Sequence, residues 1–153
     1  MTTAIGPDQL CALFERVIQT SPYTRWSGVT IERCTQGEVV LLLGRREEMT
    51  QHHGYLHGAV IGYLIDSGCA WAAATVAGDV VTASYNVNVL APATAPRFRC
   101  VARVVKAGRK LVFCRAEVFG LDGDEATLVA TGDSVIASVG DDLSTFLARI
   151  EGG

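Results

Sequence analysis

The residues that could do chemistry gather in one short segment, QHHGYLHGAVIGYLID, which begins at Gln51 and ends at Asp66. This segment holds every histidine of the chain: His52, His53 and His57. His57 and Gly58 stand where a long apolar run begins. Unpaired backbone N–H groups at the start of a helix can hold a developing oxyanion. A tight corner between a loop and a helix would use the same two residues, so the pattern allows an acyl-transfer site without requiring one.

Asp66 stands in the middle of an apolar run from Gly58 to Ala77, GAVIGYLIDSGCAWAAATVA. About 20 residues of helix would extend roughly 30 Å, and this helix would be apolar on nearly every side. An ionised carboxylate there costs several kcal/mol unless it is paired, hydrogen-bonded or facing a cavity. We therefore expect Asp66 to be the central catalytic carboxylate. A structural acid satisfied by a hidden hydrogen bond is the alternative.

The spacing of the two candidate groups indicates more than one subunit. His57 and Asp66 are nine residues apart, so on one helix they lie roughly 13 Å apart along the axis and about half a turn out of phase. One chain cannot easily bring both groups to the same carbonyl. In a two-fold dimer, Asp66 of one subunit can meet His57 and Gly58 of the other. We therefore expect a homo-oligomer, a dimer or a dimer of dimers, with its active site at the subunit interface.

Other catalytic chemistries fit the sequence less well. Zinc sites of hydrolases use spacings such as H-E-x-x-H on one helical face, whereas His52 and His53 are adjacent and point apart in most conformations. The chain has no G-x-S-x-G motif, and Cys69 has no histidine at helical spacing. We expect neither a metal nor a redox cofactor.

The apolar helix is framed by patterns typical of antiparallel strands. An amphipathic helix is expected near the N-terminus, at about residues 7–20. Period-two alternation in VTASYNVNV predicts the clearest strand. Together with the other β-rich runs, the expected strands are 28–34, 38–43, 81–89, 97–106, 110–120 and 126–139. The tail after Gly140 is expected to be weakly structured. The class is therefore α+β, with an antiparallel curved sheet wrapped around a long central helix.

Length and composition agree with this fold class. A chain of 153 residues is enough for a single domain over residues 1–153 with its core at about 25–140. A mean hydropathy of +0.28 is high for a soluble protein and suggests that some apolar surface is buried between subunits. A membrane span is a competing interpretation of the helix, but Asp66 at its centre disfavours it. Five cysteines without C-x-x-C spacing, and no apparent export signal, favour a cytoplasmic location.

The charge distribution is more informative than the net charge of −3, which argues against a general nucleic-acid binder. Seven of the thirteen basic residues fall within residues 97–115: Arg97, Arg99, Arg103, Lys106, Arg109, Lys110 and Arg115. No acidic residue occurs between Asp79 and Glu117. The sequence thus predicts a local cationic patch, or else a solvated strand face whose charges deter aggregation.

The site segment resembles the hotdog-fold acyl-CoA thioesterases, in particular the PaaI-like group. The shared features are Gln51, then His57-Gly58 six residues later, then the acid Asp66 on the central helix. The resemblance extends through VTASYNVNVLAPA and AGRKLVFCRAEVF, and so covers about residues 25–140. The commoner motif of this family is His-Gly-Gly, and this chain has His-Gly-Ala with Ala59 at the third position. The difference bears on the range of substrates accepted more than on the reaction. The resemblance implies a hotdog fold and hydrolysis of an aromatic or medium-chain acyl-CoA.

The resemblance also implies a role for each site residue. Asp66 would be the nucleophile or general base, and the Gly58 N–H would polarise the thioester carbonyl. His57 would hold the loop and the leaving group, and Gln51 would orient the substrate or the attacking water. Ser84 occupies the place of a water-positioning hydroxyl in some members of the family.

The cationic patch gains a use from the same resemblance, because Lys106 and Arg109 could bind the phosphates of coenzyme A. Two alternatives share the fold. A hydratase or dehydratase would normally want a histidine paired with an acid on the helix, and a non-catalytic acyl-CoA-binding protein would bind without turnover. Neither accounts as well for Gln51, His57, Gly58 and Asp66 together.

Overall fold

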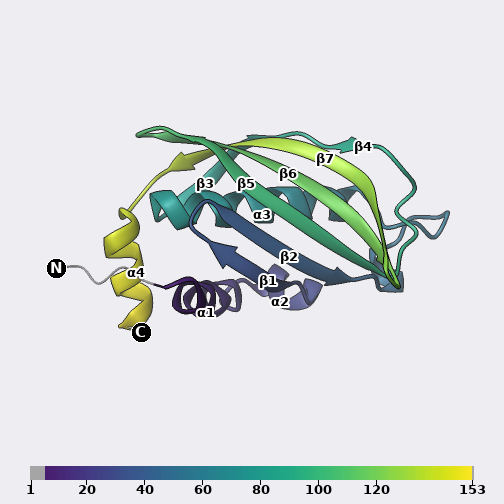
Figure 1. The fold of residues 1–153 in the computed structure, drawn as a ribbon, viewed down its shortest axis with the longest axis horizontal. Helices are drawn as coiled ribbons and strands as arrows, with labels where there is room; N and C mark the ends of the chain where they lie inside the picture. The colour runs from purple at the N-terminus through teal and green to yellow at the C-terminus, as the bar shows by residue number, and fades with distance from the viewer. Residues whose placement is uncertain (1–5, 153) are drawn as a thin grey trace.

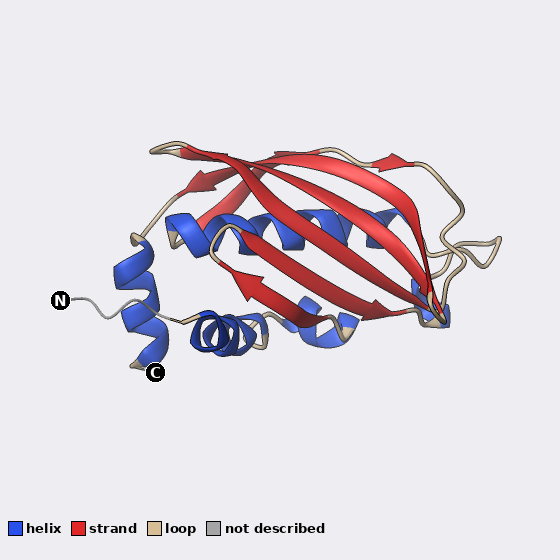
Figure 2. Ribbon diagram, in the orientation of Figure 1, coloured by secondary structure: helices blue, strands red, loops and turns tan. Residues whose placement is uncertain are grey.

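The computed structural model describes residues 6–152 and shows a curved sheet wrapped around one long helix (Figures 1 and 2). The helical elements are α1 (Pro7–Ile18), α2 (Pro22–Ser27), the 3-10 turn η1 (Glu47–Met49), α3 (Gly58–Ala77) and α4 (Leu143–Glu151). The strands are β1 (Thr30–Thr35), β2 (Glu38–Gly44), β3 (Val80–Tyr85), β4 (Asn88–Val89), β5 (Arg97–Ala107), β6 (Leu111–Asp122) and β7 (Glu125–Ser138). The α+β class and the antiparallel curved sheet around a central helix are confirmed.

The sheet runs in the order β1-β2-β5-β6-β7-β3, and β4 also pairs with β7. Every neighbouring pair is antiparallel. The long strands β5, β6 and β7 lie next to one another in this order. Buried and exposed side chains alternate along much of each strand, as expected for a strand with one face toward the core. β1 and β3 lie at the two ends of this order, so each leaves one edge of the sheet unpaired among residues 6–152.

α3 forms the core that the sheet wraps. Leu64, Ile65 and Cys69 are fully buried on it, and truncating such a leucine to alanine costs about 2–5 kcal/mol. A side chain at Gly68 would place its Cβ 3.1 Å from both Ala102 Cβ and Cys100 Sγ, so glycine lets the helix approach β5 closely. By length and composition α3 could cross a membrane. In this fold, however, 61% of the 18-residue apolar stretch of the helix is buried. The helix therefore has the environment of a core helix.

The helix α1 packs against both α3 and α4. Phe14 of α1 is fully buried, with its ring edge-on to Trp71 of α3 at 5.9 Å and against Phe146 of α4 at 6.1 Å. α4 begins at Asp142, whose side chain accepts a hydrogen bond from the Thr145 N–H at 2.9 Å. The expectation of a weakly structured tail after Gly140 is therefore wrong, because a capped amphipathic helix buries its apolar face on α1.

The structure differs from the predicted elements at two further places. The N-terminal helix ends at Ile18, and a separate helix, α2, starts at Pro22 with Ser21 as its cap. The strand predicted over 81–89 is divided into β3 and β4, because residues 86 and 87 leave the ladder. Both differences alter what surrounds the central helix.

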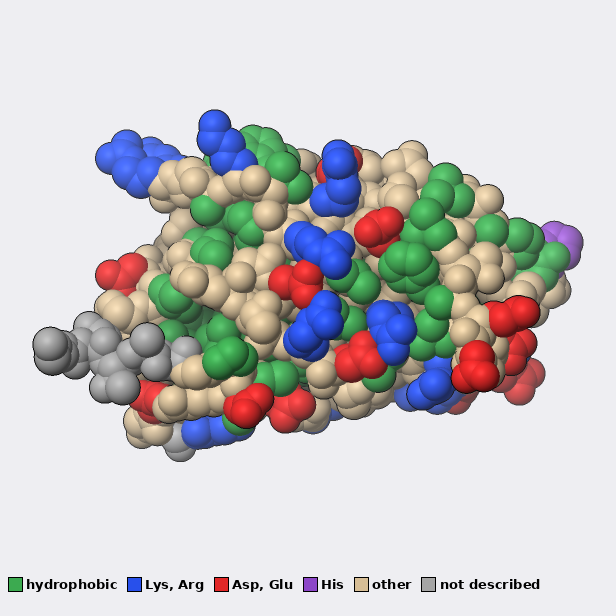
Figure 3. All heavy atoms as spheres, in the orientation of Figure 1, with side chains coloured by type: hydrophobic (Ala, Val, Ile, Leu, Met, Phe, Trp, Pro, Cys, Tyr) green, Lys and Arg blue, Asp and Glu red, His purple; other side chains and the backbone are tan. Residues whose placement is uncertain are grey.

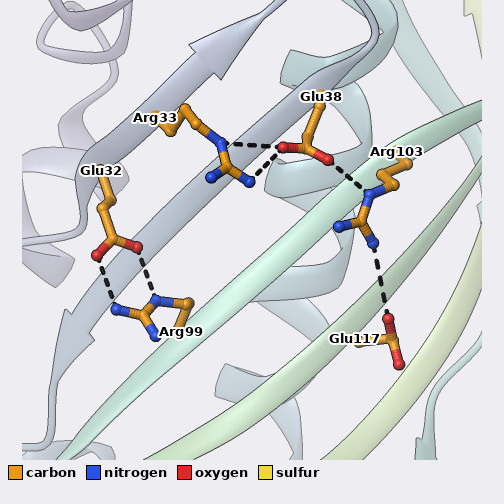
Figure 4. A network of polar contacts seen from close by, with 6 residues as sticks. All are labelled: Glu32, Arg33, Glu38, Arg99, Arg103 and Glu117. Carbon is orange, nitrogen blue, oxygen red and sulfur yellow. Dashed lines mark hydrogen bonds and ion pairs between the residues drawn. The ribbon is translucent and has the colours of Figure 1, made fainter.

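The outer face of the sheet carries a network of ion pairs across β1, β2, β5 and β6 (Figure 4). Glu38 binds both Arg33 and Arg103. Arg99 donates two hydrogen bonds of 2.7 Å to the Glu32 carboxylate. The Arg103 guanidinium also lies 3.8 Å from the Glu117 carboxylate. Figure 3 shows these acidic and basic side chains interleaved across the middle of the face.

Candidate active site

The start of α3 presents a free backbone donor. His57 is its cap, and the His57 Nδ1 accepts a hydrogen bond of 3.0 Å from the Ala59 N–H. The proton of the neutral imidazole is thereby assigned to Nε2. Within residues 6–152 the Gly58 N–H donates to no acceptor, and a Cβ at Gly58 would meet no atom within 4 Å. The first N–H of the helix is thus open to a ligand, with the positive end of the helix dipole behind it.

Gln51 lies close to Gly58, as the sequence led us to expect. The loop turns tightly through Gly54, whose φ is +79°, and the Gln51 N–H donates to the Tyr55 carbonyl at 2.9 Å. The Gln51 side chain accepts a hydrogen bond from the His53 N–H. Gln51 and Gly58 both line a cavity of about 400 Å³, together with Tyr55, Leu56, Ile61 and residues 89–93. This cavity joins the loop, the helix start and the segment after β4.

His52 and His53 stand on the exposed tip of the same loop, with ring centroids 4.0 Å apart. Within residues 6–152 no three potential ligands from His, Cys, Asp and Glu come together. Cys69 is fully buried, so it cannot be reached from solvent although a hydrogen bond with the Cys114 thiol lowers its pKa.

Asp66 is half-buried, two turns further along α3 than Gly58. The Thr82 hydroxyl on β3 donates to its Oδ1 at 2.6 Å. No Lys, Arg or His of the described residues lies within ion-pair distance of this carboxylate. One neutral donor leaves several of its lone pairs available. Asp66 therefore has the environment of a group that can act on a ligand.

Ser84, for which the resemblance implies a water-positioning role, does not lie beside this carboxylate within the subunit. Thr82 pairs with Ile136, and Ser84 pairs with Val135, so Ala83 between them is an extra residue in the ladder. Such a bulge rotates the later residues of the strand onto the other face of the sheet. Ile136 is fully buried against α3. Thr82 thus faces the helix, and Ser84 lies on the outer face.

Thr82 is the residue beside Asp66 that the sequence analysis did not single out. It shares the polar parity of VTASYNVNV with Ser84, so strict alternation would put both hydroxyls on one face. Only the bulge separates them. The sequence shows Thr82 as a hydroxyl residue in the predicted strand. Only the register of β3 against β7 shows that Thr82, and not Ser84, faces Asp66.

Ser84 instead lines a hollow of about 620 Å³ on the outer face, which Lys106 also lines. Phe113 links them, because Ser84 pairs with Val135, Val135 with Phe113, and Phe113 with Lys106. These residues form one row across four strands. The two predicted site residues are therefore neighbours of each other but not of the Asp66 carboxylate within one subunit.

The predicted cationic patch is divided by the fold. Arg99, Arg103 and Arg115 are held by the acids Glu32, Glu38 and Asp133. Lys106 near the end of β5 and Arg109 in the turn that follows it are both exposed, and neither forms an ion pair within the described residues. Figure 1 places this turn toward the C-terminal end of α3, and the loop before α3 at the opposite end.

Comparison with known proteins agrees with this architecture. Residues 53–127 match the family model described as Thioesterase superfamily. A protein of Sulfurisphaera tokodaii, whose name gives it provisionally as an esterase, is 30% identical over 112 residues, which are 72% of this chain and 82% of that protein.

Two solved structures show the same fold. A thioesterase family protein from Silicibacter pomeroyi has a TM-score of 0.80 at 28% identity, covering 84% of this chain and 96% of that chain. The Escherichia coli PaaI protein of the phenylacetic acid degradation operon has a TM-score of 0.81 and covers 89% and 97%, but at 17% identity this likeness concerns the fold alone.

The chain therefore belongs to the thioesterase superfamily and has the hotdog fold. It is a hydrolase that acts on thioesters. The resemblance found in the sequence is confirmed. Gln51 lies just before the matched residues, whereas His57, Gly58 and Asp66 lie within them.

Proposed function

We propose that this single-domain protein is an acyl-CoA thioesterase that produces a free acid and coenzyme A, with Asp66 as its central catalytic carboxylate. One observation carries the proposal. Asp66 is half-buried on the core helix and bonded to a single neutral hydroxyl, with no cation in ion-pair range among the described residues. Structural carboxylates at partly buried positions are normally paired. An unpaired one in a thioesterase fold supports a catalytic role.

Each group in the proposal has a chemical task. Asp66 either attacks the thioester carbonyl or takes a proton from the attacking water. The Gly58 N–H donates to the carbonyl oxygen as negative charge develops on it. If Asp66 acts as base, the water oxygen bonds to the acyl carbon, the C–S bond breaks, and the thiolate of coenzyme A takes up the proton. If Asp66 attacks, the C–S bond breaks to leave a mixed anhydride with Asp66, and water then hydrolyses this anhydride to the free acid and restores the carboxylate. His57 and Gln51 hold the loop and orient the reactants.

Thr82, and not Ser84, supplies the hydroxyl beside the carboxylate, and it holds Asp66 rather than the attacking water. Its hydroxyl fixes one oxygen of Asp66 at 2.6 Å, which leaves the other oxygen to face the reactants. We regard it as a positioning residue, because the group it touches is the carboxylate and not the substrate.

A second subunit is part of the proposal. Gly58 and Asp66 lie about 12 Å apart along one helix, too far to serve one carbonyl. β3 supports a two-fold arrangement, because it ends the sheet and exposes Val81 and Tyr85 to 52% and 48%. Joining two such edges would bring Asp66 of one subunit toward Gly58 of the other. We propose a dimer or a dimer of dimers. A protein that sediments as a monomer and is still fully active would contradict this proposal.

The substrate assignment uses the unpaired cations. Lys106 and Arg109 at the β5–β6 turn are proposed to bind phosphates of coenzyme A. An aromatic or medium-chain acyl group would occupy the apolar side of the site. All five cysteines are free thiols, which supports a cytoplasmic location. No metal or cofactor takes part in the proposed reaction.

The test is thiol release from a panel of acyl-CoA thioesters by wild type and Asp66→Asn. The amide can still accept the hydrogen bond from Thr82, so the fold should be kept while the negative charge is lost. We expect kcat to fall at least about 100-fold. Equal rates in the two proteins would assign the chemistry to another residue. Binding of acyl-CoA without turnover by wild type would favour the acyl-CoA-binding alternative.

A further inference from the structure

The open side of α3 around Asp66 is lined by small residues, with Tyr63 as the exception. Ala59 is exposed, and Ser67 and Ala70 are half-buried, so none of them limits the space beside the carboxylate. Tyr63 precedes Asp66 by one turn, which puts the two Cβ atoms about 5–6 Å apart on the same side of the helix. Its ring is therefore the nearest bulky group on that side of α3.

Tyr63 is held in place by α2. Its hydroxyl lies 3.0 Å from the Ser27 Oγ and 3.4 Å from the Thr24 Oγ1. The Tyr23 ring meets it edge-on, with centroids 4.8 Å apart. Edge-to-face contacts of this kind add to the stability given by burial alone. A ring fixed at both its hydroxyl and its face cannot easily swing aside for a ligand.

α2 is itself anchored, so it can act as a support. Arg46 donates to the Trp26 carbonyl at 2.6 Å and to the Ser27 carbonyl at 3.4 Å, and its guanidinium lies 5.1 Å from the Trp26 ring centre. Gly28 ends the helix with a φ of +72°, a conformation that favours glycine. The short helix therefore has a fixed position beneath Tyr63.

The direction of a bound substrate brings the acyl group toward this ring. The turn between β5 and β6, which follows Lys106 and contains Arg109, lies toward the C-terminal end of α3 (Figure 1). A substrate that has its phosphates there and its carbonyl at Asp66 must extend its acyl group toward the N-terminal end. Helical side chains tilt the same way. On the other side of this path, Tyr85 and Val87 lie over Gly62, 3.4 and 3.5 Å from where its Cβ would be.

We propose that Tyr63, supported by α2, is the residue that limits the length of the acyl group. This inference rests on the proposed thioesterase function, because it places the acyl group relative to Asp66. The ring forms the far wall of the acyl site, with Tyr85 and Val87 along one side. Replacing the ring with a small side chain opens the path toward Ala59, and longer acyl chains then gain burial.

The test compares kcat/KM over a series of saturated acyl-CoA thioesters of increasing length for wild type and Tyr63→Ala. Each additional buried methylene is worth about fourfold in kcat/KM. We therefore expect the optimum to move to acyl chains at least two carbons longer, and the ratio of long to short substrates to rise at least about tenfold. Tyr63→Phe keeps the ring and should keep the wild-type optimum.

Arg25→Ala is the matched control, because Arg25 lies on α2 but is exposed and donates to the Gln19 carbonyl rather than contacting Tyr63. It should leave the length profile unchanged. An unshifted optimum in Tyr63→Ala, or an equal shift in Arg25→Ala, would overturn the inference. If Tyr63→Ala does not fold, Tyr63→Leu shortens the wall while keeping apolar packing, and the same shift is required of it.

The two proposals can fail separately. Wild type without activity on any acyl-CoA would remove the proposed function. An active wild type whose length profile ignores Tyr63 would remove this inference alone.

Discussion

The carboxylates of the outer sheet face and the carboxylate of the core helix are treated in opposite ways by the fold. On the outer face, Glu32 and Glu38 each meet at least one arginine (Figure 4). Asp66 on α3 is half-buried, where a charge is harder to hold, yet its partner is the neutral hydroxyl of Thr82. The exposed acids therefore have cationic partners that they need little, whereas the half-buried acid has none among residues 6–152.

This difference separates charges that serve the sheet from charges that are available for chemistry. Exposed ion pairs contribute little stability and mainly fix neighbouring strands in register. A partly buried carboxylate without a cation is a cost that folding alone does not explain. The same division applies to the cations, since Arg99 and Arg103 are paired while Lys106 and Arg109 form no ion pair within residues 6–152. Three sets of variants test this division, beginning with the largest expected effect.

Thr82→Val should lower kcat about tenfold to a hundredfold, because a hydrogen bond to a charged group contributes about 1.5–3 kcal/mol. Thr82→Ser keeps the hydroxyl and should recover most of the rate. Ser84→Ala is the matched control on the same strand and should change kcat less than twofold if Ser84 faces away from the site. A larger loss in Ser84→Ala than in Thr82→Val would show that the bulge does not select the hydroxyl that supports the reaction. Steady-state thiol release measures all three.

The double variant Lys106→Ala, Arg109→Ala should raise KM for acyl-CoA about tenfold, since each lost contact between a cation and a phosphate costs up to about 1 kcal/mol. kcat should stay nearly constant. A short N-acetylcysteamine thioester has no phosphates, so its KM should be the same in both proteins. Arg99→Ala is the control for a cation already paired with Glu32. If Arg99→Ala raises KM as much as the double variant, the division between paired and unpaired cations is wrong.

The smallest effect concerns the ion pair between Arg99 and Glu32. Hydrogen bonds from Arg99 lower the pKa of Glu32 below its ordinary value of 4.5. A lowered folded-state pKa stabilises the protein above that ordinary value, and this stability is lost as the pH falls through the folded-state pKa. Wild type should exceed Arg99→Ala by about 1 kcal/mol or less at pH 7. Urea unfolding between pH 7 and pH 3 should show the difference shrinking below pH 4.5; a constant difference would mean that Arg99 acts through packing.

Much of the fold was readable because it depends on local periodicity. The β-rich runs of β5, β6 and β7 and the continuous apolar run of α3 each indicate an element before any tertiary contact is known. α4 was missed because its apolar face is short and becomes convincing only against Phe14 of α1. α2 was missed because six residues are too few for a periodic pattern.

The candidate site divides along the same line. A charged residue inside an apolar helix is conspicuous in any sequence, and so is a His-Gly pair at the start of such a helix. The sequence alone could therefore nominate Asp66, His57 and Gly58, and the fold places them on α3 as expected. Their catalytic roles stay predictions until the variants are measured.

The sequence by itself determined the strands, the central helix and the position of its buried acid, because periodicity and the cost of burying charge act over a few neighbouring residues. Only the tertiary structure decided which hydroxyl meets Asp66, since one extra residue at Ala83 turns Ser84 to the opposite face. It also decided which arginines are neutralised, because Arg99 and Glu32 are 67 residues apart along the chain and meet only across the sheet. Such pairings follow from strand order and ladder register, which no local pattern encodes.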